Sequence, residues 1–326
     1  MSDSHHARFD WYDCWIGTFS SASHFTEARR PGSGVSMTSI ATEFCTVVDR
    51  IEDGDHHWAV VMEQCDPSNP TDALLVLTAQ AIRDAYGEQE LKEIADEAFL
   101  LQLPEPADAV LSQFSLGDLL ASFRGGLPNP EAEGNKPAQL SNYRSETAEI
   151  LAREALSRVF NMITPPSLHA VKGNRNQPIL GFDGWTLMAL GCGNLALVLI
   201  QVKATDDKSR PPSEAAKLIT ECSKAPVDIE KLKGFVSACV IRCKGTPFDK
   251  ILIKMLADLH RENSVKDIIV APVIIRGVVE ADHRDLSTLK SATEKFVGAS
   301  TRGMSLSVGA NLNDFGKMAM NMARQS

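Results

Sequence analysis

The chain has 326 residues, 44% of them apolar and 23% charged, with a formal net charge of −9. This composition is typical of a soluble globular protein, and no apolar run approaches the roughly 18 residues of a membrane helix. The first residues, MSDSHHARFDWYDCW, lack the basic and apolar regions of a secretory signal. Seven cysteines without a CxxC pair favour reduced thiols, and we therefore expect a cytoplasmic protein without a membrane partner.

Residues 1–123 predict an acidic α/β N-terminal domain. Segments 39–51 and 57–65 contain short apolar runs that suit strands or short helices. The segment 70–101 predicts a helix broken near Gly87, with Thr71 or Asp72 as its cap. Another short helix is expected over 115–123.

A linker is predicted at 124–140, RGGLPNPEAEGNKPAQL, because this stretch is rich in Gly, Pro, Asn and Glu. The second domain then covers 141–326. Apolar residues at helical spacing predict a helix over 142–160. Two strands are expected over 178–190 and 195–205, joined by a hairpin turn at Gly191-Cys192-Gly193-Asn194.

The remaining segments alternate between predicted helices and one strand. Helices are expected over 212–225, 228–243, 248–263, 285–300 and 312–325. The segment 266–277 is rich in β-branched residues and predicts a strand that contains Pro272. The fold class is therefore α/β.

Charge is distributed unevenly along the chain. Residues 1–137 contain 23 acidic and 8 basic residues, a balance of −15, whereas residues 138–326 contain 19 and 25, a balance of +6. Ordinary sequence drift and a C-terminal half that faces nucleic acid both fit this asymmetry. The basic residues that follow position 205 are interleaved with acids, among them Glu221, which favours a solvated helix face.

Polar side chains occupy selected positions in the helix–strand–strand–helix order after residue 141. Residues i and i+2 of a strand point to the same side, so Gln201 and Lys203 share a face while Val202 points away. Asp183 lies in the preceding strand. Glu146 and Glu149 lie three apart on the first helix and therefore on neighbouring parts of one face.

This arrangement suits metal-assisted hydrolysis of a phosphodiester. Mg²⁺ (or Mn²⁺) prefers oxygen ligands and keeps several waters, so Asp183 and the Val202 carbonyl would suffice as ligands. A helix acid, Glu149 in preference to Glu146, would hold a metal-bound water. Lys203 would orient the attacking water and offset transition-state charge.

A helix Glu, then an Asp, then (Asp/Glu/Gln)-x-Lys on the next strand resembles the PD-(D/E)XK nuclease superfamily, over residues 141–205 and more loosely through 267–276. The resemblance implies a restriction-endonuclease-like mixed sheet flanked by helices and a metal-dependent DNA endonuclease. Most members have a glutamate where this chain has Gln201, a departure also seen in a Mrr-like branch of restriction enzymes. The amide oxygen can bind a metal but brings no charge, which favours a single-metal site.

The segments Gly181-Phe182-Asp183 and Gln201-Val202-Lys203, with the helix acids before them, also resemble the HamA nuclease subunits of Hachiman anti-phage defence systems. This narrower resemblance implies an antiviral effector whose helicase (ATPase) partner restrains the nuclease. It also implies DNA as the substrate.

Each polar residue also has a structural interpretation without catalysis. Asp183 lies between glycines and suits a turn, Gln201 and Lys203 suit the end of a buried strand, and helix acids favour the helix dipole. The alternative function is a non-catalytic subunit that keeps the nuclease fold to bind DNA or a partner protein. The sequence contains no GxxxxGK[ST] motif, which would indicate ATP hydrolysis, and no GxSxG motif, which would indicate acyl transfer.

Overall fold

A computed structural model describes residues 44–100, 116–131, 143–164, 182–190, 194–224, 226–246, 248–262 and 267–325. Residues 43–189 and 195–326 belong to one compact unit. Residues 1–42 and 190–194 are a separate unit, of which Leu190 and Asn194 are described, and the Leu190 N–H donates to the Asn194 carbonyl at 2.8 Å.

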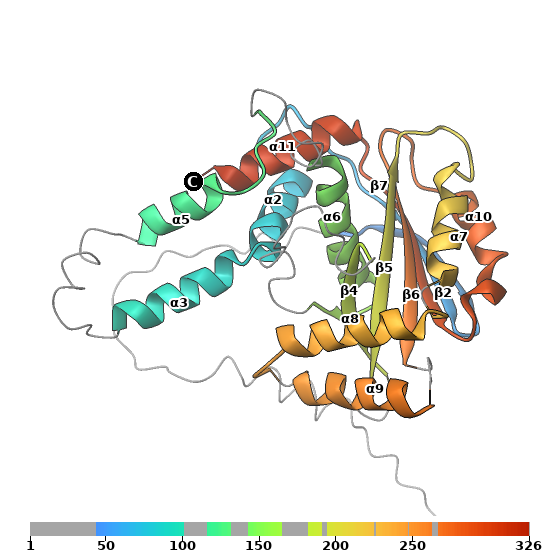
Figure 1. Cartoon of the computed structure of the whole chain (residues 1–326). Helices are drawn as coiled ribbons and strands as arrows, with labels where there is room; N and C mark the ends of the chain where they lie inside the picture. Colours follow the sequence, from blue (N-terminus) through green and yellow to red (C-terminus); the bar gives the residue numbers. More distant parts are fainter. Residues whose placement is uncertain are drawn as a thin grey trace, which may run out of the picture. The chain divides into compact units, whose positions relative to one another are not determined.

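The described strands form one mixed sheet in the order β1-β2-β7-β6-β5-β4-β3 (Figure 1). Strands β3, β4 and β5 form an antiparallel meander, whereas β5, β6, β7 and β2 run parallel and β1 is antiparallel to β2. The strands are β1 (Val47–Asp53), β2 (His56–Met62), β3 (Met162–Ile163), β4 (Gly184–Ala189), β5 (Leu195–Thr205), β6 (Ile268–Arg276) and β7 (Ser300–Ser307). The α/β class and the mixed sheet are thus confirmed.

The two regions predicted as separate domains contribute strands to this one sheet. Strand β2 comes from the region 1–123, yet it pairs along its whole length with β7 near the other end of the chain. Four consecutive residues of β2, Trp58 to Val61, are buried, because both faces of the sheet are covered at this strand. The boundary at 124–140 therefore does not divide the sheet.

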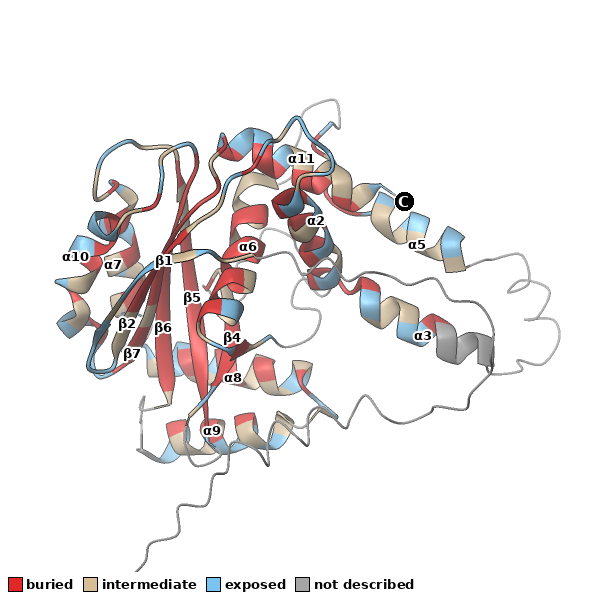
Figure 2. Ribbon diagram, turned by 180° about the vertical axis from the view of Figure 1, so that it is seen from behind, coloured by how far each residue is buried: buried red, intermediate tan, exposed pale blue. Residues whose placement is uncertain are grey.

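Helices cover both faces of the sheet (Figures 1 and 2). One face carries α2 (Ala73–Ala85), α6 (Tyr143–Val159) and α11 (Leu312–Arg324), which pack against one another. The other face carries α7 (Glu214–Lys224), α8 (Ile229–Arg242), α9 (Asp249–Glu262) and α10 (Ser287–Lys290). The other described helical segments are α3 (Glu88–Leu100), α5 (Leu116–Gly125), η3 (His283–Leu286) and η4 (Thr293–Phe296). The described part of the chain contains no helix long and apolar enough to cross a membrane.

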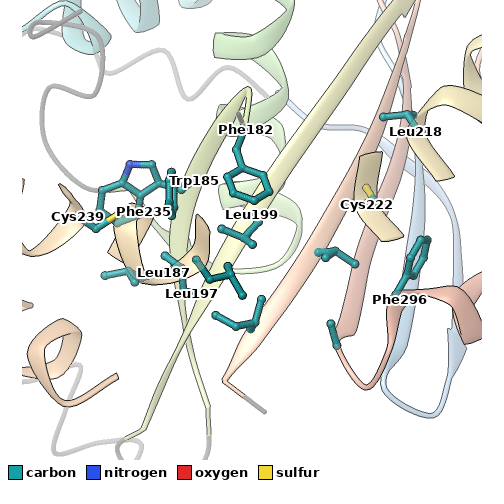
Figure 3. Packing of buried hydrophobic residues seen from close by; sticks show 14 of the residues in the cluster. Phe182, Trp185, Leu187, Leu197, Leu199, Leu218, Cys222, Phe235, Cys239 and Phe296 are labelled. Atoms are coloured by element: carbon teal, nitrogen blue, oxygen red, sulfur yellow. The ribbon is translucent and has the colours of Figure 1, made fainter. Parts of the chain in front are cut away.

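A buried apolar cluster joins the sheet to α7, α8 and α9 (Figure 3). Strand β5 contributes Leu195, Leu197 and Leu199 to it, and these odd-numbered positions define the face that looks toward α7 and α8. Strand β4 contributes Trp185, whose ring lies edge-on to Phe235 of α8 at 6.4 Å between centroids. Because strand side chains alternate, the parity of a β5 residue shows which helical layer it faces.

Most predicted elements after residue 70 are confirmed, including the cap and break of the first helix pair. Asp72 accepts hydrogen bonds from the Leu74 and Leu75 N–H groups at the start of α2, and Gly87, with φ +94°, separates α2 from α3. The first two residues of the stretch predicted as a linker belong to α5, which ends at Gly125, and Arg124 binds Glu88. The helix predicted over 285–300 is instead three short helical segments followed by β7.

Candidate functional site

Asp183 lies immediately before β4, next to the polar end of β5. The register pairs Gly184 with Ile200, which brings Asp183 alongside Gln201 on the neighbouring strand. The Asp183 N–H donates to the Ile200 carbonyl at 3.1 Å, and the Val202 N–H donates to Asp183 Oδ2 at 2.7 Å. The carboxylate is thus held against the strand segment that carries Gln201 and Lys203.

Gln201 and Lys203 continue the odd-numbered face of β5 toward α7, as the alternation predicted. Gln201 is 5% exposed. The Lys203 ammonium lies 2.7 Å from Glu221 Oε2, and the two side chains are 24% and 39% exposed. Glu221 belongs to α7, so this ion pair joins the end of β5 to the helix that covers it.

The charged residues of this group influence the pKa of one buried thiol, that of Cys222. Burial raises the pKa of Cys222, the nearby carboxylates of Glu221 and Asp183 raise it further, and Lys203 lowers it. Cys222 is 1% exposed and packs against the sheet from α7. Asp183, Lys203 and Glu221 therefore all act electrostatically on this thiol of α7.

A second cation lies over the ring of Phe182, the residue before Asp183. The Lys231 ammonium of α8 lies 5.3 Å from the centre of the Phe182 ring, and Phe182 meets Phe235 edge-on at 5.0 Å. Phe182 is 2% exposed, so its ring fixes the backbone just before Asp183 while its face receives the cation. Lys231 is exposed and available to a polyanion.

The two helix acids lie on α6, which covers the opposite face of the sheet (Figures 1 and 2). Glu146 accepts a hydrogen bond from the Tyr86 hydroxyl at the end of α2. Glu149 lies one turn before the buried Arg153; burial lowers the pKa of this guanidinium, and Glu154, Glu149 and Asp84 oppose that shift. The structure thus groups the strand residues with Glu221 and directs Glu146 toward α2. The metal-bound water assigned to Glu149 or Glu146 stays a prediction.

The oxygen donors of the group fit a hard cation such as Mg²⁺. Asp183 offers a carboxylate, Gln201 an amide oxygen and Val202 a backbone carbonyl, which are the ligand types that Mg²⁺ accepts alongside water and phosphate. Within the described ranges, no three His, Cys, Asp or Glu side chains lie close enough to hold a metal ion by themselves. A metal here would therefore depend on backbone, amide, water and substrate oxygens.

Glu221 is the residue of this group that sequence reasoning did not single out. Its position next to Cys222 and three residues after Leu218, both buried, was the available signal, because it places Glu221 at the border of the sheet-facing stripe of α7. No protein-family model matches the sequence, and no curated protein matches it.

Proposed function

We propose that this chain is a metal-dependent DNA endonuclease that hydrolyses phosphodiester bonds, as the effector subunit of an anti-phage defence system controlled by a partner helicase. The observation that carries the proposal is the 2.7 Å hydrogen bond from the Val202 N–H to the Asp183 carboxylate. It holds the acid beside Gln201 and Lys203, in the order shared with PD-(D/E)XK nucleases. The mixed sheet with helices on both faces agrees with the restriction-endonuclease-like fold that this proposal requires.

Each residue has a chemical part in this proposal. Asp183, the Gln201 amide and the Val202 carbonyl would hold the cation, which when bound supplies Lewis-acid activation of the phosphate. The Lys203 ammonium, 24% exposed, can turn toward a phosphate oxygen and offset the charge that develops on it. Lys231 offers an exposed cation beside the same site for backbone phosphates.

The test is cleavage of linear and circular DNA, double- and single-stranded, with Mg²⁺ or Mn²⁺. We expect wild-type cutting that EDTA abolishes and that Lys203→Ala lowers by about 10²–10³-fold. Lys254→Ala removes an exposed cation from α9 and is the matched control. Cutting that survives both Lys203→Ala and EDTA would refute the proposal. Assays with and without any co-purifying helicase test the partner.

The second candidate is a non-catalytic subunit that binds DNA or a partner protein. Two observations favour it: Gln201 carries no charge, and Lys203 is engaged by Glu221. The acidic region 1–137 would then serve as the docking surface. DNA binding that weakens with salt but is indifferent to Mg²⁺ and to Lys203→Ala would favour this function.

A further inference from the structure

The strand residues of the candidate site offer a divalent cation only one negative charge, that of Asp183. Asp183 and Lys203 carry opposite charges, and Gln201 between them is neutral and 5% exposed. Together the three side chains have no net charge. Because the number of charged ligands tunes the affinity of oxygen sites for divalent cations, we expect this set alone to bind one weakly.

The missing charge lies on the neighbouring helix. Glu221 projects from α7 so that its Oε2, a buried oxygen, lies 2.7 Å from the Lys203 ammonium. Leu218 and Cys222, 0% and 1% exposed, anchor this part of α7 to the sheet. The packing of these two residues therefore fixes the stretch of α7 from which Glu221 reaches Lys203.

Asp183 belongs to the same group of polar residues as Lys203. Asp183 lies beside Gln201 in the β4–β5 register and accepts the Val202 N–H at 2.7 Å, while Glu221 lies 2.7 Å from Lys203, two residues further along β5. With Glu221 included, the group has two carboxylates, one amide and one ammonium, and a net charge of −1.

We infer that Glu221 supplies the carboxylate that position 201 lacks, and that the acidic pair of this site is Asp183 from the sheet and Glu221 from α7. The inference rests on the proposed nuclease function. In this arrangement Glu221 holds Lys203 in place and adds the second negative charge at the cation site. Gln201 then serves as a neutral oxygen donor.

A charge relocation tests this assignment. Glu221→Gln removes the carboxylate from α7, and the double variant Gln201→Glu/Glu221→Gln restores one on β5, on the same face. We expect Glu221→Gln to weaken Mn²⁺ binding, measured by calorimetry, and DNA cleavage by about 10–100-fold. The double variant is expected to recover both to within about tenfold of wild type. Glu214→Gln, two turns earlier on α7, is the control and is expected to change neither.

The two measurements separate the inference from the nuclease proposal. Equal Mn²⁺ affinity of wild type and Glu221→Gln, or no Mn²⁺ binding by wild type, overturns the role of Glu221 whatever the cleavage assay gives. If wild type cleaves DNA while Glu221→Gln cleaves equally well, the nuclease proposal stands and the inference fails. If Mn²⁺ binds and depends on Glu221 but no DNA is cut, the cation site stands and the nuclease function fails.

Discussion

The Arg276 guanidinium lies with its Nε 3.6 Å from Asp285 Oδ2, and solvent reaches neither side chain. Asp285 Oδ2 also accepts hydrogen bonds from the Ser305 hydroxyl at 3.0 Å and the Asp282 N–H at 3.1 Å. Arg276 in turn donates to the Ser209 carbonyl at 3.1 Å. This buried pair therefore ties the carboxyl ends of β6 and β7 to the segments that follow β5 and β6.

Removal of one partner of this pair is predicted to be strongly destabilising. Asp285→Ala leaves a buried guanidinium without its counter-charge, so we expect a loss of about 3–5 kcal/mol in the free energy of unfolding, measured in urea. Asp258→Ala breaks an ion pair with the exposed Arg261 and is expected to cost less than about 1 kcal/mol. Equal effects of the two substitutions would contradict this view of the pair.

Asp183→Asn separates the structural role of Asp183, as acceptor of the Val202 N–H, from its proposed role as a metal ligand. The amide oxygen can still accept the Val202 N–H, so we expect the free energy of unfolding to change by less than about 1 kcal/mol. Asp183→Ala leaves that N–H unpaired and is expected to cost about 1–3 kcal/mol. Both variants are expected to lose Mn²⁺ binding, measured by calorimetry. Retention of binding by Asp183→Asn would show that the carboxylate is not a ligand.

The stability of the chain is predicted to fall in acid because of Glu88. Burial alone would raise the pKa of Glu88, but hydrogen bonds from Arg124 and Lys92 lower it to about 2. The folded pKa is lower than the ordinary value of 4.5, so this stabilisation is complete above that pH and is lost as the pH falls from 4.5 through 2. Unfolding free energies measured between pH 5 and pH 2 check this, since Glu88→Gln should flatten the profile.

The control for that titration is Glu93→Gln, which removes an exposed carboxylate from the same helix. It is expected to leave the slope between pH 5 and pH 2 as in wild type. A steep profile that persists in Glu88→Gln would assign the acid sensitivity to other carboxylates.

Two glycine substitutions are predicted to change the stability of the fold in opposite directions. A Cβ at Gly303 would overlap the indole ring of Trp58, which faces it across the β2–β7 pairing. We expect Gly303→Ala to cost about 1–3 kcal/mol. Gly234 lies in α8 with open space around its Cβ position, so Gly234→Ala should stabilise by about 0.5–1 kcal/mol. Thermal melts of both variants check the pair, and a stabilised Gly303→Ala would be inconsistent with the packing described.

The sequence predicted β5 well and did not predict β7, although both are interior strands. The run LALVLI followed by Gln-Val-Lys has the apolar and alternating character of a buried strand. Strand β7 reads STRGMSLS, and on one of its two faces the buried residues, Thr301, Gly303, Ser305 and Ser307, are all small or polar. They fit because the Trp58 ring fills the space above Gly303 and because Asp285 receives the Ser305 hydroxyl, and both partners are far away in sequence.

The candidate site was predictable where it depends on neighbouring strands and not where it depends on helix placement. The hairpin order brought Asp183 to Gln201 and Lys203, since antiparallel neighbours follow from a short connection. Glu221 was missed because acids and bases alternate along that segment, which is typical of a solvated face. Only the packing of α7 on the sheet shows that this one acid meets Lys203.

The position of β2 between β1 and β7 has a consequence for the order in which the chain can fold. Residues 56–62 find their parallel partner only in residues 301–307, so the β2–β7 pairing cannot form until the long stretch of chain between them has left the ribosome. Until then the apolar segment Trp58–Val61 lacks the neighbour that buries it. During synthesis this segment is an open strand edge. At that stage its native neighbour β7 cannot protect it from aggregation.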